Sequence, residues 1–373
     1  MRTVNLPNKL LVAGILSAFV WGCGKSGGGG GSGGTTIPAS GSGGTTPSGG
    51  STGNGGSVAA GGTKGSGGTP ASGGTTASGG TTTGKGGSGT GGQGGSADAA
   101  STSTLCTVGA WPAADPSVPG PFATTTENNV GPQAGVGVDG GAPPQFTMFR
   151  PTDMAQGGLC HPVVTWGNGT GATPSMYKTL LGGLASHGFV VIASDSPNVG
   201  SGSPAPMVVG VTWVLQQNDD PTSVLYQRID TTHIGATGHS QGAFATTSAG
   251  ADSHITTIAP ICGASSQRNL HGPALLLCGG NDTNVPCDGT VQTAFNGITN
   301  VPIELADYLS ADHANWISFN YRTGSSFSAI ETAAIAWMRV QLMGDSALRS
   351  RFYGASCGLC TDSAWKITQK SMD

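Results

Sequence analysis

Short apolar runs alternate with segments of helical spacing from about residue 105 onward. Residues 189–193 form an unbroken apolar run, which is typical of a strand covered on both faces of a sheet. Residues 327–343 instead have helical apolar spacing, which predicts an amphipathic helix. Further strands are predicted at 162–166, 233–237, 255–261, 274–278 and 301–308, and further helices at 175–187, 207–217 and 241–250. The alternation predicts an α/β fold, a mainly parallel twisted sheet with helices on both faces, with residues 121–150 as an antiparallel edge.

The N-terminal part of the chain lacks this pattern. Of the 67 glycines, 33 lie between residues 24 and 98, in Gly-Gly-Thr and Gly-Gly-Ser repeats with almost no apolar side chains. Such a segment cannot bury enough surface to offset its ordering entropy. We therefore expect a disordered Gly/Ser/Thr linker at 23–104 and one large α/β domain at 105–373.

The first residues resemble an export signal. Arg2 and Lys9 precede an apolar stretch that ends at Trp21, too short to span a membrane comfortably. The sequence from Val20 to Cys23 resembles a bacterial lipobox, which implies removal of residues 1–22 and acylation of Cys23. We expect an extracytoplasmic protein that a lipid anchors to the membrane of the bacterial cell envelope; the alternative is a free secreted product.

Export makes disulfide bonds feasible, and seven cysteines remain besides Cys23. The odd number leaves at least one thiol unpaired or paired outside the chain. Cys278 and Cys287 bracket a short loop, and we expect them to pair. The C-x-x-C of Cys357 and Cys360 has neither a thioredoxin-like context nor a second ligand pair, so neither a redox role nor a metal site is expected.

Charge excludes one class of partner. The net charge is −4, and only 9% of residues are charged. No basic patch is present, so nucleic acid is not expected as a partner. We expect a monomer.

The sequence Gly238-His239-Ser240-Gln241-Gly242 has the G-x-S-x-G form and lies between a predicted strand and a predicted helix. A nucleophilic serine must stand on a tight strand-to-helix turn, and glycines on both sides remove the Cβ atoms that would clash there. Ser240 is therefore the candidate nucleophile. His239 is expected to point away from the site.

A serine hydroxyl needs a base within hydrogen-bond reach, and the base needs an orienting carboxylate. Asp282 lies in the loop after the buried run 274–278, where such an acid belongs; Asp288 and Asp307 are competitors, deeper in the loop and inside a strand. Of the seven histidines, only His313 lies both after Asp282 and at the C-terminal end of a predicted strand.

A developing oxyanion needs two backbone donors. One is expected to be the N–H of Gln241, the residue after the nucleophile. The other is expected in the glycine-containing loop after residues 162–166, where we place it at Asn168, with Gly169 as the alternative register.

These residues together resemble the dienelactone-hydrolase-like branch of the α/β-hydrolases, near bacterial cutinases and poly(ethylene terephthalate) hydrolases, with chlorophyllase-like esterases as equal neighbours. The resemblance covers about residues 120–355. The segments that carry it are 120–122, 184–191, 228–230, 238–242, the Asp282 loop, His313 and 336–338. It implies an α/β-hydrolase fold and a serine carboxylic-ester hydrolase that acts through an acyl-enzyme without a cofactor.

Two positions differ from the polyester hydrolases. Asn168 stands where they have an aromatic residue, and residues 262–266 contain no tryptophan where they have one. Because aromatic walls stack on the acyl group, the substrate remains open between small esters and polymers. Two other classes also remain: a non-enzymatic surface module on a hydrolase scaffold, and a serine peptidase or acyltransferase with the same triad.

Overall fold

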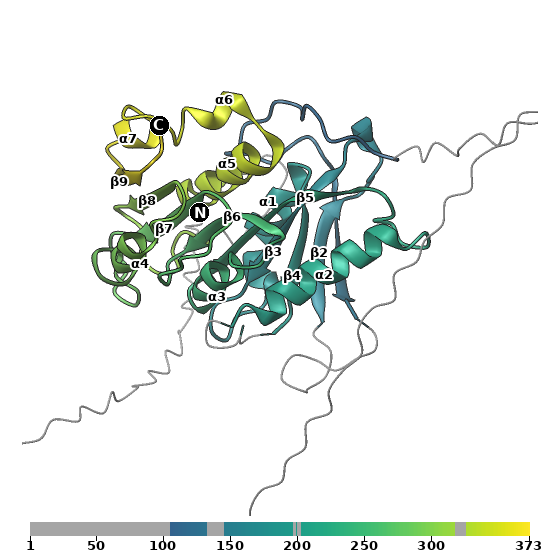
Figure 1. Cartoon of the computed structure of the whole chain (residues 1–373), viewed down its shortest axis with the longest axis horizontal. Helices are drawn as coiled ribbons and strands as arrows, with labels where there is room; N and C mark the ends of the chain where they lie inside the picture. Colours follow the sequence, from purple (N-terminus) through teal and green to yellow (C-terminus); the bar gives the residue numbers. More distant parts are fainter. Residues whose placement is uncertain (1–104, 133–144, 197–198, 200–202, 318–325) are drawn as a thin grey trace, which may run out of the picture. The chain divides into compact units, whose positions relative to one another are not determined.

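The computed structural model describes residues 105–132, 145–196, 199, 203–317 and 326–373 (Figure 1). They belong to the compact unit Gln93–Asp373. The expected signal peptide, Cys23 and the linker at 23–104 lie outside the described residues. They therefore stay predictions, as does the domain boundary at 104/105.

Nine strands form one sheet in the described part of the chain, in the order β1-β2-β4-β3-β5-β6-β7-β8-β9. The six strands from β4 to β8 in this order pair in parallel, whereas β1 and β2 at one edge and β9 at the other are antiparallel. Figure 1 shows β9 and β2 near opposite sides of the sheet. The strands are β1 Thr124–Val130, β2 Phe146–Pro151, β3 His161–Gly167, β4 Val190–Ser194, β5 Ile229–His239, β6 Ile255–Ile261, β7 Ala274–Gly279, β8 Ile303–Tyr308 and β9 Trp365–Lys370.

Helices cover both faces of the sheet. Neighbouring residues of a strand point to opposite faces, so Val164 of β3 packs in one core with α1 and α5, and Val163 packs in the other with α2, α3 and α4. Within the described ranges, no helix combines the length and the apolarity that crossing a lipid bilayer needs. The α-helices are α1 Lys178–Ser186, α2 Ala205–Asp219, α3 Gln241–Ala249, α4 Gln292–Gly297, α5 Ala329–Met343, α6 Ser346–Arg349 and α7 Gly358–Thr361, with 3-10 turns at Gln156–Gly158 and Pro174–Tyr177 and a π-turn at Cys287–Val291.

The mainly parallel sheet with helices on both faces is confirmed, and several elements differ in detail. Strand β5 begins at Ile229 rather than at residue 233, and α1 begins at Lys178 because Pro174–Tyr177 forms a 3-10 turn. The short helices α4, α6 and α7 were not predicted from the sequence, and neither was strand β9. Only Trp365 of this strand is fully buried, so its apolar alternation is weak. Its two lysines, Lys366 and Lys370, lie at the edge of the sheet and bind Asp288 and the Ile298 carbonyl group.

Capping residues in the sequence determine where helix α5 begins and ends. Ser328 Oγ accepts a hydrogen bond from the Glu331 amide at 3.2 Å, and the Ser328 amide donates to Glu331 Oε2 at 2.9 Å, so both residues satisfy N–H groups that the helix leaves free. Gly344 ends the helix with φ of 65°. The cap therefore starts α5 two residues later than the predicted helix at 327–343.

Six of the cysteines form disulfide bonds in the described part of the chain: Cys106–Cys160, Cys278–Cys287 and Cys357–Cys360. The expected pairing of Cys278 with Cys287 is confirmed. Among the described cysteines, Cys262 is the one with a free thiol, and it is buried. The odd number is thus explained, and the C-x-x-C pair closes on itself.

A buried carboxyl group on β8 makes the stability of the fold depend on pH. Burial raises the pKa of Glu304 from 4.5 to about 7, against the opposing effects of the Gln369 hydrogen bond and of Arg351. Because the folded pKa is the higher one, its stabilising contribution is complete below pH 4.5 and is lost as pH rises through about 7. By the usual conversion this loss is about 3 kcal/mol.

We expect Glu304→Gln to flatten the pH dependence of stability between about pH 4.5 and 7, since the amide cannot ionise. Urea unfolding at pH 4 and pH 8 measures it: the wild type should lose about 3 kcal/mol more than the variant. Equal losses in the two proteins would show that Glu304 does not titrate in this range.

Candidate active site

Ser240 stands at the turn between β5 and α3 with a strained backbone. Its φ and ψ are 55° and −118°, outside the ordinary regions for a residue with a side chain. A Cβ on Gly238 would lie 2.6 Å from the Gly242 carbonyl oxygen, and a Cβ on Gly242 would collide with the Gly167 carbonyl group. The glycines of the motif are therefore required by the close approach of β3, β5 and α3, and the serine is held half-exposed.

A chain of two hydrogen bonds connects the three side chains expected to form the triad. Ser240 Oγ donates to His313 Nε2 at 2.9 Å, and His313 Nδ1 donates to Asp282 Oδ2 at 2.7 Å. The three residues follow β5, β8 and β7. Because these strands are parallel, their C-terminal ends lie on the same side of the sheet and bring the three residues together. This arrangement can move a proton from the hydroxyl group to the imidazole while the carboxylate fixes the ring.

The surroundings of Asp282 keep its carboxylate in place. Its side chain is fully buried, and Oδ1 accepts hydrogen bonds from the Asn284 and Val285 amides, both at 2.9 Å. The Cys278–Cys287 disulfide closes the loop that carries it. Of the two competing aspartates, Asp288 instead pairs with Lys366, and Asp307 lies inside β8.

Asn168 lies in the loop after β3 and is fully buried. Its Oδ1 accepts from Trp166 Nε1 at 3.0 Å, and its Nδ2 donates to the Ser194 and Ser196 carbonyl oxygens at 2.6 and 3.0 Å. The side chain therefore anchors the loop instead of forming a wall of the site. The Gly169 amide, the alternative register, donates to the Tyr177 hydroxyl group at 3.2 Å. The backbone N–H of Asn168 stays the predicted oxyanion donor.

Gln241 is the first residue of α3, so its backbone N–H belongs to the turn that has no acceptor within the helix. Its side chain accepts a hydrogen bond from Thr170 Oγ1 at 3.1 Å, which joins the loop after β3 to the start of α3. The two predicted donor segments thus lie beside each other, next to Ser240. Their role in binding an oxyanion stays a prediction.

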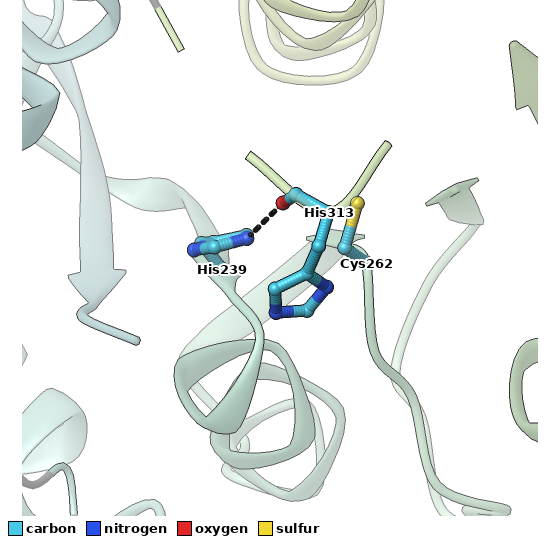
Figure 2. Close-up of side chains that lie close together, drawn as sticks. All are labelled: His239, Cys262 and His313. Atoms are coloured by element: carbon cyan, nitrogen blue, oxygen red, sulfur yellow. Dashed lines mark hydrogen bonds between the residues drawn. The ribbon is translucent and has the colours of Figure 1, made fainter. Parts of the chain in front are cut away.

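The expectation that His239 points away from the site is wrong. Its Nε2 lies 2.8 Å from the backbone oxygen of His313, and the two rings are 4.8 Å apart between centroids (Figure 2). Burial, and then the His313 charge, lower the pKa of His239 to about 4. Because Ser240 has a positive φ, side-chain alternation along β5 does not continue through the turn.

Cys262 is a site residue that the sequence analysis did not find. Its thiol forms a hydrogen bond with Asp282, and burial followed by the Asp282 charge raises its pKa. The signal was present, since Cys262 directly follows β6, which lies between the strands that lead to Ser240 and Asp282. A neutral thiol in this position adds a further hydrogen bond to the carboxylate.

His239, Cys262 and His313 are close enough to hold a metal ion, with candidate ligand atoms within 4.8 Å of one another (Figure 2). Their polar atoms are, however, engaged in the hydrogen bonds of the triad and its neighbours. The other such group contains Cys278 and Cys287, which are joined to each other. Within the described residues, both groups are better explained without a metal.

A separate hollow of about 440 Å³ is lined mainly by β1, β2 and the 3-10 turn Pro174–Tyr177. Its lining includes Gln145, Thr147, Lys178 and Asp195, and it contains none of the triad residues. It is therefore not taken as the acyl-binding part of the site.

A family model described as PET hydrolase-like matches residues 111–368, which include all three triad candidates and both oxyanion candidates. No curated protein matches the chain. The match covers most of the sequence and agrees with the mainly parallel sheet. The chain therefore belongs to the PET hydrolase-like family, with an α/β-hydrolase fold and the general chemistry of a carboxylic-ester hydrolase.

Proposed function

We propose that this protein is a serine carboxylic-ester hydrolase that acts through an acyl-enzyme on Ser240. The single observation that carries the proposal is the hydrogen-bond chain from Ser240 Oγ through the His313 ring to Asp282. Family membership supports the class of reaction, and the geometry supports the assignment of roles.

In the proposed mechanism, Ser240 Oγ attacks the ester carbonyl carbon while its proton passes to His313 Nε2. Asp282 stabilises the imidazolium that forms, and the N–H groups of Gln241 and Asn168 bind the oxyanion. Collapse of the tetrahedral intermediate breaks the bond to the alcohol, which leaves with the proton from His313. Water then attacks the acyl-enzyme with His313 as the base, and the carboxylic acid is released.

A fluorophosphonate probe tests the proposal directly, because it reacts covalently with an activated serine. We expect one label per molecule, located by peptide mass spectrometry on Ser240 and absent from Ser240→Ala. Ser248→Ala is the matched control, since Ser248 lies in α3 and its hydroxyl group donates to the Phe244 carbonyl oxygen one turn earlier. Labelling elsewhere, or none at all, would contradict the proposal and favour a non-enzymatic surface module.

For the substrate, we propose small aliphatic esters ahead of aromatic polyesters. The side chain of Asn168 is turned into the protein, and residues 262–266 contain no aromatic side chain, so neither position offers the aromatic surface found in polyester hydrolases. A panel of short and long acyl esters with a polyester film measures the preference. Faster release of acid from the film than from short esters would overturn it; cleavage of peptides would support the peptidase alternative.

We further propose that the protein is lipid-anchored through Cys23. The disulfides of the described part fit an oxidising, extracytoplasmic compartment. A fatty-acid analogue should label the wild type and not Cys23→Ala. A variant that remains equally bound to the membrane would contradict the anchor.

A further inference from the structure

A second path of hydrogen bonds runs beside the triad and joins two loops of the site. The Gly169 amide lies 3.2 Å from Tyr177 Oη, which lies 3.0 Å from His239 Nδ1. His239 Nε2 in turn lies 2.8 Å from the backbone oxygen of His313. The path thus begins in the loop after β3 and ends on the backbone of the triad histidine.

The direction of each hydrogen bond follows from the groups at the two ends. The His313 carbonyl oxygen can only accept, so His239 carries its proton on Nε2. In the neutral ring Nδ1 is then an acceptor, so the Tyr177 hydroxyl group donates to it. Tyr177 Oη is left to accept from the Gly169 N–H, which can only donate. Every donor and acceptor of the path is therefore matched in one arrangement.

Packing keeps this path out of water. Tyr177 and His239 are 2% and 5% exposed. The Tyr177 ring packs against Trp166, and His239 packs edge-on against Trp316, with centroids 4.7 and 5.3 Å apart. Burial raises the pKa of Tyr177 to about 12 and lowers that of His239 to about 4, so both are neutral across the usual assay range.

The ends of the path lie at the two groups whose placement the reaction needs. A Cβ on Gly169 would lie 3.0 Å from Tyr177 Oη and 3.4 Å from the Ser240 Cβ, so the loop with the oxyanion donor passes directly beside the nucleophile. At the other end, the His313 carbonyl also accepts from Trp316 Nε1 at 3.2 Å. A small displacement of either loop would separate the reacting groups from the substrate.

We propose that Tyr177 and His239 are positioning residues. They hold the loop after β3, which carries the predicted oxyanion donor, at a fixed distance from the loop after β8, which carries His313. The inference rests on the proposed function of Ser240, His313 and Asp282. Neither residue is proposed to touch the substrate. Their effect should therefore fall on kcat, with little change in KM.

The kinetic test uses substitutions that remove hydrogen bonds of the path, a substitution that restores them, and a matched control. We expect Tyr177→Phe and His239→Leu to lower kcat for a p-nitrophenyl acyl ester by about 10- to 100-fold, with KM changed by less than about twofold. His239→Gln keeps one donor and one acceptor and should recover most of the loss. Tyr353→Phe removes a comparable hydroxyl group, which accepts from Gln341 at 2.9 Å beside Trp337, and should not lower kcat.

A second measurement needs no substrate. In protein labelled with ¹⁵N-histidine, the resonances of His239 are identified by their loss in His239→Gln. We expect the neutral tautomer with the proton on Nε2, and a shift of the Nδ1 resonance in Tyr177→Phe. This measurement also applies to Tyr177→Phe if that variant is unstable in the assay.

The two sets of outcomes separate the proposals. Absence of esterase activity in the wild type would overturn the proposed function, while the tautomer would still decide whether the path exists. An active wild type with unchanged kcat in Tyr177→Phe and His239→Leu would overturn the positioning role. So would an Nδ1-protonated ring, or an Nδ1 resonance unaffected by Tyr177→Phe.

Discussion

Replacement of Ser240 by alanine should lower kcat for a p-nitrophenyl acyl ester by roughly five to six orders of magnitude. The variant lacks the oxygen that would form the acyl-enzyme, so only substrate binding and oxyanion stabilisation remain to accelerate attack by water. The half-exposed side chain is small, and the turn is held by its glycines, so the fold should not change.

The measurement is the burst and steady-state release of p-nitrophenol from purified protein, with the unfolding temperature as a check on the fold. Ser248→Ala serves as the control from the same region, and it should retain wild-type turnover. Residual activity within about tenfold of the wild type would exclude Ser240 as the nucleophile.

Asp282→Asn should lower kcat by about four orders of magnitude while the fold stays intact. Oδ1 of the aspartate accepts from the Asn284 and Val285 amides, so the amide oxygen of asparagine will occupy that position. Its NH₂ group then faces His313 Nδ1, which is forced to accept. The proton moves to Nε2, and the ring can no longer accept the proton of Ser240.

The matched control is Asp288→Asn, in the π-turn Cys287–Val291 that follows the Asp282 loop, whose carboxylate pairs with Lys366 at 2.8 Å in an exposed position. It should change kcat by less than about twofold. A larger loss in Asp288→Asn than in Asp282→Asn would reassign the acid. Measuring kcat/KM against pH for both variants separates loss of the base from loss of binding.

The sequence was informative where local patterns decide structure. The run 255–261 coincides with β6, and strands were also found ahead of Ser240, Asp282 and His313. In a parallel sheet the residues after such strands must meet at one edge, so the candidates could be selected from strand order alone. The family match covers the same residues.

What the sequence did not reveal depends on contacts between distant segments. The partners of His239 lie 62 and 74 residues away, and no periodic pattern connects them. The direction of its side chain was also misjudged, because alternation does not apply across a residue with φ of 55°. Strand β9 was missed for a different reason: its edge position leaves one face in solvent and weakens the apolar signal.

The lysines on β9 affect how two copies of the protein can associate through the edge of the sheet. An edge strand presents unpaired backbone groups on which a neighbouring chain can add, and charged side chains on that strand oppose such growth. Lys366 and Lys370 occupy this border, and Lys370 also reaches back to the Ile298 carbonyl group. The sheet is thereby discouraged from continuing into a neighbour, so high local concentration need not lead to fibrous aggregation through this edge.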